Sequence, residues 1–236
     1  MIGAGLFAGG AGEGKPRMHN APMYQPPQFR SQDAAIAAEL MRGYPFASLV
    51  STDDTGFPFV THLPLHLEER VPGSSPGQAS GFVLWGHCAK PNPHWRYLQQ
   101  RPEALAVFMG PHAYLSPKVY PDLQRVPSWN YLTVHCKVRA TLVEDPDAKD
   151  ALLKKLIGDH EPAYAEQWRG LGEEFARKMM AGIVGFQLDV LEWSCKLKLN
   201  QHRPESHARL REAYEAGGEQ EKQLAAWMRR LGMEGK

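Results

Sequence analysis

The chain has few cysteines and no long hydrophobic segment. Cys88, Cys136 and Cys195 are its three cysteines in 236 residues, and none of them has the CxxC spacing. An odd number of cysteines without that spacing argues against a disulfide framework and favours a reducing compartment, so we expect a cytoplasmic location. No apolar run approaches the roughly 18 residues needed to span a bilayer, which predicts no membrane partner.

An excess of charge of either sign is also missing. Lys and Arg together number 27 and Asp and Glu 26, so the formal net charge is +1. Proteins that bind nucleic acid usually carry a strong basic excess, and the overall charge therefore does not support DNA as a partner. The hydrophobic content of 43% is typical of a globular protein with one large domain, or a domain with an appendage.

Signatures of the common catalytic and metal sites are absent from the sequence. It contains no HExxH, no GxSxG and no phosphate-binding P-loop. His62 and His66 would lie about 13 Å apart along a strand, too far to share one ion. Cys136 falls on the apolar side of its expected strand, where a thiol is a core residue rather than a nucleophile. We therefore assign no catalytic residue and no metal ligand.

The hydrophobic periodicity predicts mainly strands joined by hairpins. The clearest strand is Tyr131–Val143, in which Leu132 and every second residue after it are apolar and the alternate residues are polar. The other expected strands cover 46–51, 57–67, 81–88, 104–109 and 182–193. Helices are expected at 32–42, 94–100, 145–157, 173–180, 204–214 and 219–231. Hairpins without regular strand–helix alternation predict an α+β fold with an antiparallel barrel.

The segment Gly110–Tyr131 combines prolines with aromatic and hydrogen-bonding side chains. Its prolines exclude a helix, and we expect a rigid loop between two strands. Such a loop is either part of a ligand site or an Ω-type loop that caps the core. Similar polar and aromatic residues stand at other expected strand ends. Together they suit a planar heteroaromatic ring with a phosphate tail, although each residue alone could be structural.

Several short segments of this sequence resemble segments of one protein family. They are Met23–Pro26 at the start, Thr61–Pro64, Gly110–Tyr114 with Ser116–Pro117, Trp129–Tyr131 after Pro127, and Lys198–Pro204. From Met23 to about Tyr214 the chain resembles the PaiB-like family, described as FMN-binding negative transcriptional regulators. Asn200 and His202 stand where relatives tend to have Ser and Asn.

The resemblance implies an antiparallel split β-barrel of the flavin-reductase and pyridoxamine-phosphate-oxidase type, with short flanking helices and a helical C-terminus. Such barrels are usually homodimers that bind FMN at the subunit interface. The implied organisation is a disordered or mis-annotated leader at 1–22, an FMN-binding domain at 23–203 and a C-terminal helical extension at 204–236.

With FMN as the ligand, we expect two groups of contacts. The phosphate is expected near Thr61, Lys90, Ser116 and either Lys137 or Arg139. The ring is expected near His112, Tyr114, Trp129, Asn130 and His135. His62, His87, Asn92 and Tyr131 complete the candidate set.

Two alternatives remain open from the sequence. The first is a DNA-associated regulator that does not use flavin, supported by the arginines of the C-terminal region: Arg203, Arg209, Arg211, Arg229 and Arg230. The second is a haem-binding split barrel, supported by the many histidines.

Overall fold

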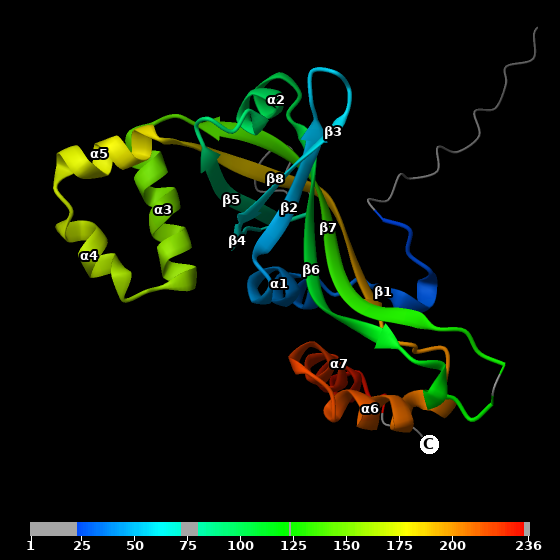
Figure 1. Ribbon diagram of the computed structural model, residues 1–236. Coiled ribbons are helices and arrows are strands. Elements are labelled where there is room, and N and C mark those ends of the chain that lie inside the picture. Colours follow the sequence, from blue (N-terminus) through cyan, green and yellow to red (C-terminus); the bar gives the residue numbers. More distant parts are fainter. Residues whose placement is uncertain (1–22, 72–79, 123, 234–236) are drawn as a thin grey trace, which may run out of the picture.

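The computed structural model describes residues 23–71, 80–122 and 124–233 (Figure 1). The expected leader at 1–22 lies outside the described residues. Within the described residues, none of the helices is long and apolar enough to cross a membrane.

The fold is built on one curled antiparallel sheet of eight strands, which confirms the α+β split-barrel prediction. The strands run in the order β3-β2-β6-β7-β8-β5-β4, and β1 pairs with β8 outside this path. Their bounds are β1 (Arg30–Ser31), β2 (Phe46–Thr52), β3 (Pro58–Pro64), β4 (His66–Glu69), β5 (Phe82–Ala89), β6 (Glu103–Leu115), β7 (Ser128–Val143) and β8 (Ile183–Lys198).

A single residue, Leu65, connects the two edge strands of the sheet, β3 and β4. β3 ends at Pro64 and β4 begins at His66, so the chain passes from one edge of the sheet to the other through Leu65. The prediction of one continuous strand over 57–67 was therefore wrong. Pro64 has no N–H to extend the ladder, and the N–H of Leu65 donates to the Pro45 carbonyl at 3.0 Å. Because β3 also contacts β5, the sheet curls into a barrel.

The core lies inside the barrel and follows the period-two pattern of the strands. Leu132, Val134, Cys136 and Val138 on β7 are all buried, as the alternation predicted. Thr133, expected on the polar face, is buried as well. Its hydroxyl donates to the Phe108 carbonyl at 2.7 Å, which satisfies the polar group at a crowded position.

The helices lie around the sheet. Their bounds are α1 (Ala34–Gly43), α2 (His94–Gln100), α3 (Pro146–His160), α4 (Tyr164–Gly170), α5 (Glu173–Ala181), α6 (His207–Glu215) and α7 (Glu219–Arg230). Figure 1 shows α3, α4 and α5 projecting from the barrel as an open ring. α4 was not predicted, because its 7 residues are too few for a periodic signal and no side chain caps its N-terminus.

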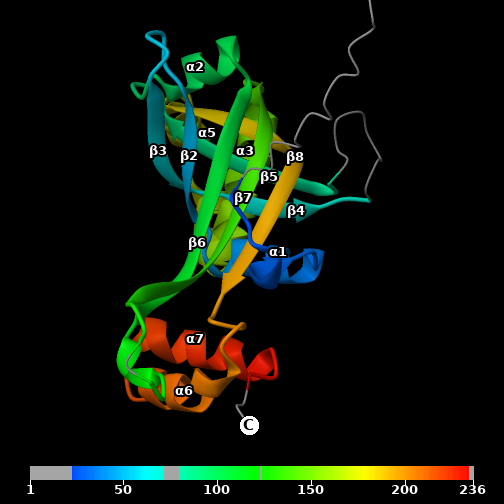
Figure 2. The ribbon, with the colours of Figure 1, turned by 90° about the vertical axis from the view of Figure 1, so that its right-hand side faces the viewer.

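β6 and β7 extend beyond the barrel as a long two-stranded arm (Figure 2). We expected a loop over Gly110–Tyr131, but β6 continues to Leu115 and β7 begins at Ser128. Pro111 is accommodated by a register shift between Met109 and His112, the kind of irregularity at which a strand tolerates proline.

The amphipathic helix at the C-terminal end, α7, packs on this arm together with α6. Leu224, Trp227 and Met228 of α7 are buried against it. The helix therefore docks on its own chain, a question that the sequence pattern left open.

Candidate functional site

A hollow lies on the outer face of β6, β7 and β8, where the arm leaves the barrel. We call it the arm hollow; its volume is about 800 Å³. It is lined by Met23, Tyr24, Met109, His112, Trp129, Tyr131, Thr133, His135 and Lys196. Four of the predicted site residues, His112, Trp129, Tyr131 and His135, are thus brought together here.

Strand alternation and register position these side chains. Trp129, Tyr131 and His135 lie at odd positions of β7, so they share the face opposite to the core. Tyr131 pairs with His112 on β6 and with Lys198 on β8, and Thr133 pairs with Met109 and Lys196 in the same way. The three strands therefore place neighbouring side chains on one surface.

One side of the hollow is an aromatic wall. The indole Nε1 of Trp129 donates to Nδ1 of His112 at 3.2 Å, which requires the neutral His112 tautomer protonated at Nε2. Tyr114 lies edge-on to Trp129 with ring centroids 6.0 Å apart. Trp129 and Tyr114 remain 47% and 49% exposed, so their surfaces are available to cover a planar ligand.

Two lysines stand next to this wall. Lys196 is buried, its Nζ donates to the Tyr24 carbonyl at 3.2 Å, and it lies 5.2 Å from the ring centroid of Tyr131. Lys198 lies 5.7 Å from the same ring. Burial and the charge of Lys196 lower the pKa of Lys198, so an anion bound here would relieve an existing repulsion. Sequence reasoning missed Lys196, because the expected strand ended at Trp193 while β8 continues to Lys198.

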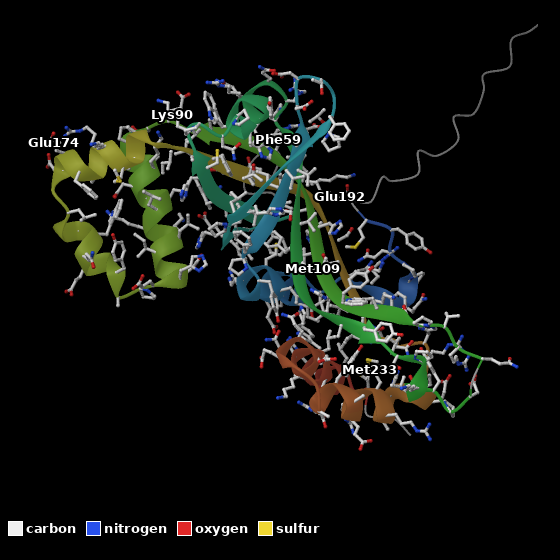
Figure 3. The ribbon with its side chains drawn as sticks, viewed as in Figure 1. Phe59, Lys90, Met109, Glu174, Glu192 and Met233 are labelled. Atoms are coloured by element: carbon white, nitrogen blue, oxygen red, sulfur yellow. The ribbon has the colours of Figure 1, made fainter. Side chains whose placement is uncertain are left out.

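Thr61 and Asn92 lie in a different cluster, at the α2 end of the barrel. The Thr61 hydroxyl is 2.7 Å from Nδ1 of His94 and accepts a hydrogen bond from Asn92 Nδ2 at 3.1 Å. Lys90 is exposed beside α2, and Figure 3 shows it far from Met109 of the arm hollow. The structure does not bring these candidates together with the hollow.

Three further candidates have local partners of their own. The exposed His62 has Nδ1 3.0 Å from the Ser48 hydroxyl. Lys137 pairs with Glu192 at 2.8 Å, and Arg139 pairs with Glu103 at 3.0 Å. Both cations lie on the outer face of β7, but neither lines the arm hollow.

The last three candidates do not line the arm hollow. His87 is half-buried on β5, where burial lowers its pKa. Ser116 accepts the Lys118 N–H at 3.3 Å as the cap of a short 3₁₀ helix, Pro117–Val119. Asn130 is fully buried on the other face of β7, and its Nδ2 donates to the Tyr214 hydroxyl at 3.0 Å.

The sequence matches one protein-family model and one curated relative well. The family model is described as "Putative FMN-binding domain" and matches residues 23–192. The "Protease synthase and sporulation protein PAI 2" of Bacillus subtilis is 31% identical over 189 residues, which are 78% of this chain and 84% of that protein.

Solved structures share the fold at much lower sequence identity. The flavocytochrome Anf3 from Azotobacter vinelandii aligns with a TM-score of 0.57 and 17% identity over 75% of each chain. The FAD and heme binding protein from Mycobacterium smegmatis aligns with a TM-score of 0.52 and 18% identity, covering 72% of this chain and 73% of that one. At this level of identity the likeness shows the split-barrel fold.

Proposed function

Because this chain belongs to the FMN-binding domain family, whose model matches residues 23–192, we propose that it is a cytoplasmic, homodimeric flavoprotein that holds FMN in the arm hollow. The observation that carries this proposal is the meeting of an aromatic wall with the buried Lys196 in one hollow. Its volume of about 800 Å³ lies in the range of small-molecule and cofactor sites.

The residues present fit both ends of FMN. Trp129, Tyr131 and His112 offer flat surfaces for the tricyclic ring, with Tyr114 and His135 as further ring contacts. Lys196 offers its charge to the phosphate. It takes the role that was expected of Thr61, Lys90, Ser116, Lys137 and Arg139, which lie outside the hollow. Bound flavin would supply electron-transfer chemistry, while the chain would orient the ring and limit the access of water.

A titration of flavin-free protein with FMN tests the proposal. We expect quenching of FMN fluorescence at micromolar concentrations, and Trp129→Ala should weaken binding about tenfold because it removes a stacking surface. Trp168→Ala is the matched control, since Trp168 lies on α4 and donates to Asp150 instead. Absence of quenching, or an equal loss in the two variants, would contradict FMN binding at this site.

The same hollow favours haem as a second candidate. Two histidines and two methionines line it, His112, His135, Met23 and Met109, and these are the residue types that bind haem iron axially. Haem addition should then produce a Soret band that is shifted and sharpened relative to free haem, and a His112→Ala or His135→Ala variant should lose this change. A spectrum that remains that of free haem would eliminate this candidate and leave the flavin proposal unaffected.

We also infer a regulatory role, since the Bacillus subtilis relative carries a name referring to protease synthesis and sporulation. Two of the C-terminal arginines are already paired with carboxylates. Arg229 pairs with Glu215, and Arg230 pairs with Glu39 at 2.6 Å. Promoter retardation with a steep salt dependence would support direct DNA contact. A shift that is absent or insensitive to salt would leave an indirect role.

A further inference from the structure

A second, smaller pocket lies at the far end of the arm, close to the segment that leads into α6. We call it the tip pocket; its volume is about 190 Å³. It is lined by Phe29, Leu115, Tyr120, Arg125, Val126, Ser128, Asn130, Lys198, Asn200, His202 and Arg203. Ser128 and Asn130 are even positions of β7, so the tip pocket lies on the opposite face of that strand from the arm hollow.

The tip pocket contains one buried hydrogen-bond donor and one buried hydrogen-bond acceptor that have no partner among the described residues. Nε of Arg125 and Oδ1 of Asn130 are buried, and neither has a hydrogen-bond partner among the described residues. Asn130 is fully buried, so its vacant oxygen is also shielded from water. A buried polar group without a partner is unfavourable, so a ligand that supplies both partners would be favoured.

The hydrogen-bond network fixes which end of the Asn130 amide is vacant. The Tyr214 hydroxyl donates its single proton to the Tyr114 carbonyl at 3.3 Å. It must therefore accept from Asn130, which places the NH₂ group at Tyr214 and leaves Oδ1 free. Asn130 can thus accept a hydrogen bond from a ligand but cannot donate one to it.

The charge around the pocket is positive. Arg125, Lys198 and Arg203 line it, and no carboxylate is among the lining residues. Arg125 pairs with Asp122 at 2.8 Å and with Glu205 at 3.5 Å, whereas Lys198 donates to uncharged oxygens, the Ser128 hydroxyl and the Trp129 carbonyl. An anion in the tip pocket would therefore meet the half-buried Lys198, for which the described residues supply no carboxylate partner.

We propose that the tip pocket binds hydrogen phosphate, either free or as the terminal group of a phosphate monoester in its singly protonated form. Its charged oxygens accept hydrogen bonds from Arg125 Nε and Lys198 Nζ, while its remaining P–OH donates to Asn130 Oδ1. The pocket can hold several water molecules at about 30 Å³ each, which is room enough for a tetrahedral oxyanion. Sulfate has a similar shape but no proton at neutral pH, so this site distinguishes the two ions.

Calorimetric titration of FMN-free protein with inorganic phosphate and with sulfate at pH 7 tests the assignment. We expect phosphate to bind more tightly than sulfate, and Arg125→Gln and Lys198→Met each to weaken phosphate binding about tenfold or more. Asn130→Leu should abolish the preference for phosphate over sulfate. Arg177→Gln, on α5 beyond the pocket, is the matched control and should bind as the unaltered protein does.

Three outcomes would overturn the proposal. They are no phosphate binding at millimolar concentrations, equal binding by the Arg125→Gln and Arg177→Gln variants, and equal affinity for sulfate and phosphate. Displacement of phosphate by FMN, one for one, would also overturn it, because the pocket would then belong to the flavin site. Since phosphate is titrated without FMN, the result does not depend on the flavin proposal. Tighter binding of glycerol 3-phosphate than of inorganic phosphate would identify a monoester as the source.

Discussion

The imidazole ring of His94 is buried, and each of its two nitrogens lies within hydrogen-bond distance of a hydroxyl group. Nε2 is 2.8 Å from the Ser51 hydroxyl, and Nδ1 is 2.7 Å from the Thr61 hydroxyl. The side-chain oxygen of Asn92 accepts the His94 backbone N–H at 3.0 Å, which also starts α2. Burial lowers the pKa of His94 to about 4, so the ring stays neutral near pH 7. The cluster therefore joins α2 to β2 and β3, a structural role that the sequence left open.

The buried His94 makes stability dependent on pH. Between its unfolded pKa of 6.5 and its folded pKa of about 4, the unfolded chain binds more protons. The free energy of unfolding should therefore fall as the pH is lowered through this window, by about 3 kcal/mol for this group. Urea denaturation at pH 7, 5.5 and 4 would measure the slope.

His94→Gln is the variant that isolates this contribution, because glutamine is uncharged at every pH. We expect it to be less stable than the unaltered protein at pH 7 but to lose much less stability on acidification. His62→Gln is the matched control, since His62 is exposed and bonds only Ser48 through its ring. A pH slope that is the same in the unaltered protein and in the His94→Gln variant would show that the imidazole is free to protonate in the folded state.

Strand alternation decides which of the candidate residues share a face. Once β7 is recognised, the odd positions Trp129, Tyr131 and His135 must share a face, and they line one hollow. Asn130 was included as a neighbour in the sequence, but the same alternation turns it to the other face. Lys196 could not be found, because the sequence does not show how far β8 extends beyond Trp193.

At the scale of elements, Glu68 on β4 connects the projecting helix α3 to the barrel. Its carboxylate accepts hydrogen bonds from Arg70 at 2.6 Å, from Trp85 at 3.0 Å and from Lys155 of α3 at 2.6 Å. Burial alone would raise the pKa of Glu68, but the bonds from Lys155 and Arg70 outweigh it and lower the pKa to about 2. The carboxylate is therefore charged at all ordinary pH values.

Removing this charge should loosen α3 without unfolding the barrel. In Glu68→Gln we expect the backbone amides of Pro146–His160 to exchange about fivefold faster, since partly buried ion pairs contribute on the order of 1 kcal/mol. Hydrogen exchange followed by mass spectrometry measures this directly. Glu69→Gln is the control, because Glu69 pairs with Arg42 of α1 at 2.7 Å instead. Equal exchange in the two variants would mean that the apolar contacts of Leu152 and Leu156 hold α3 alone.

The bounds of elements with a strong hydrophobic periodicity were predicted closely. The bounds of elements that depend on tertiary contacts were not. α7 was visible from the spacing of Leu224, Trp227 and Met228, all of which are buried. The break at Leu65 depends on where the barrel closes, and that information lies in strands distant in sequence. The arm that replaces the expected loop over Gly110–Tyr131 depends on a register shift that accommodates Pro111.

At the scale of the whole molecule, the arm hollow lies on a larger apolar face. Phe46 and Val60, 68% and 47% exposed, flank His62 on β2 and β3. The register of β2, β6 and β7 aligns this surface with that of Met109 and Trp129. Exposed apolar patches of this kind commonly mark protein interfaces. A second copy seated on this face would cover the hollow, in agreement with the proposed homodimer that binds FMN between subunits.

Phe46→Glu tests this assembly, because it introduces a charge into the proposed interface without touching the core. We expect size-exclusion chromatography with light scattering to show a dimer for the unaltered protein and a monomer for Phe46→Glu, with dimer affinity reduced at least about a hundredfold. FMN binding should weaken in parallel, since an uncovered hollow exposes the ring to water. Phe175→Glu is the matched control, because Phe175 is 51% exposed on α5, outside this sheet face. A monomeric unaltered protein, or a Phe46→Glu variant that remains a dimer and binds FMN normally, would show that flavin binding needs only one chain.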